Sequence, residues 1–181
     1  MNIEINRIAV ITLLAEKSAK LGRTALMKYC YFLQTLRRVP LGYSFSLYSY
    51  GPFDSDVLAD LGAAESVGGV KTEVEYYPGG YGYRIEPGIR KDGAKRWGAD
   101  FLQRYESDID WVLEQFGTLN ASQLELASTI VFSDREAAIK GEKLASEQLA
   151  QRVQDIKPHF STAQILDLLS DLKKRNLLKT T

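Results

Sequence analysis

The sequence contains one cysteine, one histidine and no apolar run long enough to cross a membrane. A single thiol excludes an internal disulfide, and Cys30 with His159 cannot supply the ligands of a structural zinc site. A hydrolase of the Ser-His-Asp or Cys-His type needs an imidazole to accept the proton of its nucleophile, whereas His159 lies in a predicted loop. We therefore predict a chain that is not an enzyme and that holds no cofactor and no metal.

The N-terminal residues lack the pattern of a secretory leader. Residues 1–11 carry Glu4 and Arg7 inside their apolar pattern and have no small-residue cleavage site. We expect a cytoplasmic protein that does not contact a membrane.

Hydrophobic residues make up 45% of the 181 positions, enough to fill the core of one domain or of one domain with an extension. The net charge is zero, but the charge is unevenly placed along the chain. Residues 1–40 are mainly basic, residues 41–70 carry acidic groups alone, and residues 106–142 are mainly acidic. Such a distribution is typical either of docking between complementary patches or of ordinary solvated helix faces.

Periodicity of the apolar residues predicts most of the elements. A three- to four-residue spacing indicates helices over 4–19, 24–38, 54–66, 89–116 (with a kink near Gly98), 120–132, 143–157 and 162–176. Alternating patterns indicate strands over 43–49, 70–77 and 82–86, with a hairpin turn at Pro78-Gly79-Gly80-Tyr81. We expect Thr24 and either Asp54 or Ser55 to cap helices, and capping boxes at Ser122/Glu125 and Ser161/Gln164.

These elements predict an α+β fold that is mostly helical. Residues 1–117 would form a winged-helix-like part, in which the strands 43–49, 70–77 and 82–86 make one small antiparallel sheet that includes the β-hairpin. Residues 118–181 would form an all-helical C-terminal extension packed on it. In such a module residues 54–66 would occupy the position of a DNA-recognition helix. That segment contains four acidic and no basic residues, which phosphates would repel. DNA binding by a transcription regulator is therefore the alternative rather than the preferred function.

Two groups of residues are candidates for an interaction surface. The first is the turn that follows the 43–49 strand, where aromatic and acidic side chains flank a Gly-Pro pair: Tyr48, Tyr50, Gly51, Pro52, Phe53, Asp54 and Asp56. The second is a basic surface on the first two helices: Arg23, Lys28, Arg37 and Arg38. The aromatic residues of the turn could equally pack the strand onto the helices. A further cluster, Glu106, Asp108, Asp110 and Glu114, is typical of a solvated or docking helix face.

Two blocks of this sequence resemble the Panacea domain of SocA-like antitoxins and YwgA-like bacterial proteins. Residues 22–34, GRTALMKYCYFLQ, are similar to the opening block of that family, and residues 43–53, which end in YGPF, to its second block. The resemblance covers about residues 5–90, and residues 124–130 and 156–161 are similar to the helical tail of the YwgA-like branch. One departure is Asp54, which stands where the family often has serine.

The resemblance implies an antitoxin-like protein of bacteria or phages. Such a module binds a partner protein, neutralises it and in some members presents it to a protease. The expected partner is a protein, for example a toxin encoded nearby or a component of a protease system. The sequence leaves the oligomeric state open.

Overall fold

The computed structural model describes residues 3–180, which divide into two compact units. Unit 1 comprises residues 3–45 and Phe53–Asn120, and unit 2 comprises Ser46–Pro52 and residues 121–180. The fold is α+β and mostly helical, as predicted. Residues 46–52, which we expected within the N-terminal part, group with the C-terminal helices. Among the described residues, no helix combines the length and the apolar character that a membrane crossing requires.

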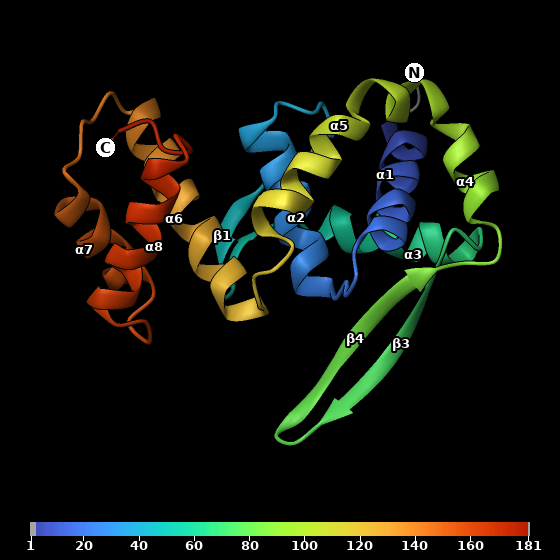
Figure 1. Cartoon of the computed structure of the whole chain (residues 1–181), viewed down its shortest axis with the longest axis horizontal. Coiled ribbons are helices and arrows are strands. Elements are labelled where there is room, and N and C mark those ends of the chain that lie inside the picture. Colours follow the sequence, from blue (N-terminus) through green and yellow to red (C-terminus); the bar gives the residue numbers. More distant parts are fainter. Residues whose placement is uncertain (1–2, 181) are drawn as a thin grey trace. The chain divides into compact units, whose positions relative to one another are not determined.

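Unit 1 is built around its first helix, α1 (Ile3–Lys17). The unit also contains α2 (Arg23–Leu36), α3 (Ser55–Ser66), α4 (Lys91–Trp97) and α5 (Ala99–Phe116) (Figure 1). Helix α1 packs against α3, α4 and α5, and its residues 8–15 are all buried. Rings of Phe32 and Phe116 stack with their centroids 4.0 Å apart and join α2 to α5. The core of unit 1 therefore lies between α1, α2 and α5.

A β-hairpin extends from unit 1 as a two-stranded arm, drawn in green in Figure 1. Strands β3 (Val70–Tyr77) and β4 (Gly80–Pro87) pair in register from Val70 opposite Pro87 to Tyr77 opposite Gly80. Pro78 and Gly79 make the turn, with Gly79 at a φ of +96° that favours glycine. A bridge between Leu21 and Ile85 ties the loop after α1 to β4, which completes the element order of a winged-helix module.

Unit 2 consists of three helices and one tight turn. Helix α6 (Ala121–Ile139) packs against α7 (Ser146–Ile156) and α8 (Thr162–Lys174). The turn lies between β1 (Ser46–Tyr48) and β2 (Gly51–Phe53), and the chain re-enters unit 1 at Phe53. The fully buried carboxylate of Asp134 accepts hydrogen bonds from the backbone N–H groups of Lys179 and Thr180, so α6 holds the C-terminal segment.

The predicted three-stranded sheet is wrong. In the described part of the chain the strands form two separate antiparallel pairs, β1 with β2 and β3 with β4, and the predicted 43–49 strand is shortened to Ser46–Tyr48. The reason is that the side-chain amide of Gln34 accepts from the N–H of Tyr43 (2.9 Å) and donates to its carbonyl (2.8 Å). These bonds use the backbone groups that Tyr43 would need for pairing with another strand.

Helix boundaries were mostly predicted, with local differences. The predicted Ser161/Gln164 capping box opens α8. Of the two candidates for the cap of α3, Asp54 and Ser55, it is Asp54 that caps the helix. The predicted cap at Thr24 is wrong, since Gly22 is the N-cap of α2. Helix α6 begins at Ala121, so Ser122 lies inside the helix and cannot be its cap. The helix expected over 89–116 is interrupted at Gly98 rather than kinked.

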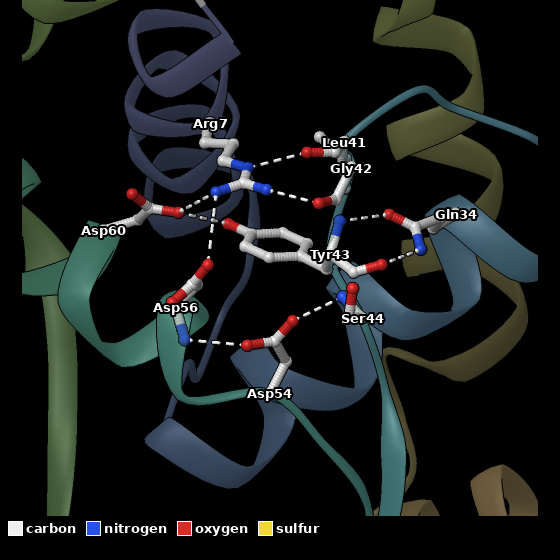
Figure 2. A network of polar contacts seen from close by, with 9 residues as sticks. All are labelled: Arg7, Gln34, Leu41, Gly42, Tyr43, Ser44, Asp54, Asp56 and Asp60. Atoms are coloured by element: carbon white, nitrogen blue, oxygen red, sulfur yellow. Dashed lines mark hydrogen bonds and ion pairs between the residues drawn. The ribbon is translucent and has the colours of Figure 1, made fainter.

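A buried arginine ties the chain segment before β1 to two helices (Figure 2). Arg7 of α1 donates to the carbonyls of Leu41 (2.6 Å) and Gly42 (2.7 Å) and lies 3.4 Å from the carboxylate of Asp60 in α3. The hydroxyl of Tyr43 donates to the same carboxylate (2.9 Å), and the guanidinium lies 4.1 Å from the centre of the Tyr43 ring.

The electrostatics of this network reflect its burial. Burial raises the pKa of Asp60, and the hydroxyl of Tyr43 and the guanidinium of Arg7 oppose that rise. Burial also raises the pKa of Tyr43, so its hydroxyl stays protonated and donates. Beside the network, Asp54 accepts from the N–H of Ser44 and from that of Asp56 (2.9 Å), which joins the chain leaving unit 1 to the chain that returns. The network is therefore a structural tie.

Replacing Arg7 with methionine should lower the free energy of unfolding by about 3–5 kcal/mol, because Asp60 would stay buried without its cation. Lys17→Met is the matched control, since Lys17 pairs with Glu106 (2.7 Å) and Asp110 (2.6 Å) at the surface, and it should cost less than about 1 kcal/mol. Urea denaturation followed by circular dichroism measures both. Equal losses in the two variants would contradict the assigned role of Arg7.

Candidate functional site

The turn between β1 and β2 is fixed from beneath by a buried lysine. Lys157, at the end of α7, is 3% exposed, and its ammonium donates to the carbonyls of Tyr48 (3.4 Å) and Ser49. The same Nζ atom lies 2.8 Å from Oε1 of Glu125 in α6, which balances its charge. One desolvated cation therefore holds two consecutive carbonyls of the turn and one helix.

A close approach of the backbone to α6 holds the other side of the turn. Gly51 has a φ of +88°, a conformation that side chains rarely adopt. A Cβ atom at this position would lie 3.0 Å from Oγ of Ser128 and 3.1 Å from Oγ1 of Thr129. Both hydroxyls donate back to the carbonyl of Glu125, at 3.0 and 2.8 Å, so they cannot easily turn away. Only glycine fits here without strain.

The two tyrosines of the turn point outward from this fixed backbone. Tyr48 is 66% exposed and Tyr50 is 71% exposed, while Leu47 in the middle of β1 is half-buried and lines one hollow with Phe132 and Ile156. Side chains of a strand alternate between faces, which explains why Leu47 faces inward and Tyr48 does not. The sequence left open whether these rings face solvent or pack the strand onto the helices, and the structure exposes both.

The other predicted residues of the turn have structural roles. Gly51 and Pro52 are buried and Phe53 is half-buried, so these residues shape the backbone and present little surface. Asp54 caps α3, and Asp56 stands at the exposed start of that helix, 4.0 Å from the guanidinium of Arg7. Tyr48 to Pro52 belong to unit 2, whereas Phe53, Asp54 and Asp56 belong to unit 1.

The predicted basic surface is corrected by the structure. Lys28 is 2% exposed and is no part of any surface, because the helix that carries it is buried on nearly all sides. Arg37 pairs with Asp108 (2.7 Å) and lies 4.8 Å from the ring centre of Trp111, and the guanidinium of Arg23 lies 3.4 Å from the ring centre of Tyr83. Arg38 is exposed.

The acidic cluster on α5 pairs with basic residues of the first two helices and their ends. Glu106 and Asp110 pair with Lys17, and Asp108 pairs with Arg37. Opposite charges that are distant in the sequence thus neutralise each other within unit 1. Among the described residues, no group of three or more His, Cys, Asp or Glu side chains is arranged to hold a metal ion.

Sequence reasoning missed the buried ionic groups that support the turn. Lys157 and Glu125 are 32 positions apart. Glu125 belongs to a predicted capping box and both residues lie in segments that resemble the YwgA-like tail, but neither pattern predicts that the two side chains pair. The available signal was weak: Glu125 interrupts the apolar run of α6, and Lys157 precedes Pro158 at the end of a helix. His159, expected in a loop, lies there with its Nε2 atom 3.5 Å from Oε1 of Glu125.

Gly51→Ala should lower the free energy of unfolding by about 2 kcal/mol or more, because it combines a strained φ with two contacts near 3.0 Å. Gly62→Ala in α3 is the matched control, since open space surrounds Gly62 and alanine is the better helix former. The control should be neutral or slightly stabilising. Thermal and urea unfolding measure the stability of both variants. Equal effects of the two substitutions would show that Gly51 is not closely packed against α6.

The thiol of Cys30 should be inert in the folded protein. Cys30 is 1% exposed, and burial raises the pKa of its thiol to about 12. A thiol-specific disulfide reagent should react at least about a hundredfold more slowly with the native chain than with the chain in urea. Comparable rates in the two conditions would show that Cys30 is accessible.

No protein-family model matches this chain, and no curated protein matches its sequence. The resemblance of residues 22–34 and 43–53 to the Panacea domain thus remains a prediction from sequence. What the chain does has to be inferred from its own side chains, above all from the exposed tyrosines and the buried groups that hold their backbone.

Proposed function

We propose that this chain acts in the cytoplasm as an antitoxin-like protein-binding module that binds and neutralises a partner protein. One observation carries the proposal: two exposed tyrosines stand on a turn whose backbone is fixed by Lys157 and by the tight seat of Gly51. The resemblance to the Panacea family supplies the antitoxin context and the possibility of presenting the partner to a protease.

Physical chemistry supports a contact role for this turn. Tyrosine is enriched at binding hot spots because a rigid ring buries much area and its hydroxyl keeps a hydrogen bond. A turn that is already held in one conformation loses little entropy on binding. The ammonium of Lys157 provides that rigidity without occupying the outer surface, since it lies beneath the turn and is itself 3% exposed.

The charged residues of α3 and of the first two helices give little support to the alternative function, a DNA-binding regulator. Helix α3, in the recognition position, carries Asp56, Asp60 and Glu65 and no basic residue. On the first two helices, Lys28 is buried and Lys17 and Arg37 are paired with carboxylates of α5. Lys20 and Arg38 are exposed and Arg23 lies over the ring of Tyr83, so few cations of this region are left for phosphate, which binds to several cations on one face.

Truncating both tyrosines should abolish neutralisation and leave the fold intact. A short neighbouring reading frame whose product poisons cells identifies the partner, and co-expression with this chain should restore growth. Tyr48→Ala/Tyr50→Ala should lose that rescue, because each central aromatic anchor commonly contributes about 2 kcal/mol or more to binding. Ile139→Ala is the control, since Ile139 is also exposed (83%) and lies on α6 of the same unit.

Growth, protein level and melting temperature are measured on the same variants. Rescue by the double variant, or a lowered melting temperature in place of selective loss of rescue, would refute the contact role of the turn. A low-salt DNA titration tests the alternative: tight binding with a steep salt dependence, lost in Arg37→Glu/Arg38→Glu, would favour the regulator.

A further inference from the structure

The arm formed by β3 and β4 has two chemically different faces. Because strands alternate their side chains and the register is fixed, one face carries the apolar and aromatic residues of both strands: Val70, Thr72, Val74, Tyr76, Tyr81, Tyr83 and Ile85. The other face carries the charged residues and the glycines: Lys71, Glu73, Glu75, Tyr77, Gly80, Gly82, Arg84 and Glu86. The arm is thus an amphipathic ribbon.

The charged face is satisfied by the arm itself. Lys71 pairs with Glu73, and Arg84 pairs with Glu86 and lies 3.9 Å from Glu75. The hydroxyl of Tyr77 donates to the carbonyl of Tyr81 (3.0 Å), and the ring of Tyr77 lies over Gly82. Two cations are thus shared among three carboxylates, and this face keeps a net charge of −1.

The aromatic face extends beyond the core of unit 1 into solvent. At its base Val70 and Ile85 are each 2% exposed, whereas nearer the tip Val74 is 48%, Tyr81 59% and Tyr76 82% exposed. The rings of Tyr76 and Tyr81 lie 6.4 Å apart, and those of Tyr81 and Tyr83 lie 5.9 Å apart edge to face. A hairpin alone is marginally stable in water, so a continuous aromatic face of this kind indicates a surface that is covered in use.

Hydrogen bonds at the base of the arm show which backbone groups point outward. The N–H of Thr72 donates to Glu65 (2.8 Å) and that of Ile85 donates to the carbonyl of Leu21 (2.8 Å), so neither bonds across the hairpin. Opposite residues of an antiparallel ladder alternate between hydrogen-bonded and non-hydrogen-bonded pairs. Thr72 lies opposite Ile85, and these two residues form a non-hydrogen-bonded pair. The N–H and C=O groups of Val74 and Tyr76 therefore also point away from β4.

The two edges of the arm differ in access. On the β4 side the guanidinium of Arg23 lies 3.4 Å from the ring centre of Tyr83, and a Cβ atom on Gly22 would lie 3.1 Å from the Tyr83 carbonyl. On the β3 side, within residues 3–180, no group is bonded to the outward N–H and C=O groups of Val74 and Tyr76. The open edge is therefore β3 from Val74 to Tyr76.

We propose that this β3 edge binds an extended peptide segment of another protein by strand addition, and that the segment alternates apolar and basic side chains. Added strands alternate their side chains between the two faces of a sheet. Apolar side chains would continue the face of Val74 and Tyr76, and basic side chains would lie beside Glu73 and Glu75 on the other face. Glu73, Glu75 and Glu86 share only Lys71 and Arg84, so one carboxylate of this face is in excess and favours a basic partner.

Two-fold pairing with a second copy of the chain is unfavourable in the registers centred on Val74 and on position 75. Two β3 strands related by a two-fold axis would pair antiparallel. Centred on Val74, the pairing places Glu73 opposite Glu75, and centred on position 75 it places two copies of Glu75 opposite each other. Like charges directly opposite destabilise a strand pair, so the edge favours a partner with basic residues.

A labelled synthetic peptide of about six residues that alternates valine and lysine is the probe, and fluorescence anisotropy measures its binding to the full chain. Val74→Pro is the test variant, because its missing N–H points outward and the bonds to β4 stay intact. The dissociation constant should rise at least about tenfold in Val74→Pro and change little in Val74→Thr, which keeps the N–H. Hydrogen exchange should show new protection at Val74 and Tyr76.

A peptide of the same composition with its valines and lysines in separate blocks should bind at least about tenfold more weakly. A second test needs no variant of the chain: methylating the peptide amides that face β3 should abolish binding, and methylating the opposite amides should not. No binding of the alternating peptide, equal binding of the block peptide, or unchanged binding by Val74→Pro would overturn the proposal. Tyr50→Ala should bind the peptide normally, so failure of this surface and failure of the turn in unit 2 are distinguishable.

Discussion

The guanidinium of Arg7 is the constraint on which the path of the chain in unit 1 depends. It is buried in α1, and it holds the carbonyls of Leu41 and Gly42 and the carboxylate of Asp60 together (Figure 2). A charge inside a protein is tolerated only when it is paired and hydrogen-bonded, so these partners are required as well as favoured. The segment before β1 and the helix after β2 are thereby fixed at the points where the chain leaves unit 1 and returns to it.

In unit 2 a second buried cation holds a loop in the same way. Lys157 is desolvated, and Glu125 balances its charge. Its ammonium donates hydrogen bonds to two carbonyls of the turn. Removing either ion would leave the other uncompensated, which makes the pair sensitive to substitution. In each unit a loop is thus held by a buried cation, Arg7 of α1 in unit 1 and Lys157 at the end of α7 in unit 2.

The exposed tyrosines occur where short β elements present aromatic rings on anchored backbone. In unit 2 these rings are Tyr48 and Tyr50 on the turn, and in unit 1 they are Tyr76 and Tyr81 on the arm. The surroundings differ in charge: glutamates flank the open edge of the arm, whereas the polar groups beneath the turn are buried and paired. The two surfaces would therefore select partners of different chemistry, one by backbone pairing and one by aromatic anchoring.

The sequence by itself determined the helices, the hairpin with its Pro-Gly turn, and the cap at Ser161, because these follow from local spacing and local hydrogen bonds. It also identified Tyr48 and Tyr50 as candidate contact residues, but whether their rings face solvent was decided by the tertiary structure. Tertiary structure alone decided that Gln34 stops Tyr43 from pairing, that Lys28 is buried, and that Arg37 is neutralised by Asp108. It likewise brought Lys157 to the carbonyls of residues more than 100 positions away. Contacts between distant side chains depend on how the helices pack, and no local pattern of residues encodes that packing.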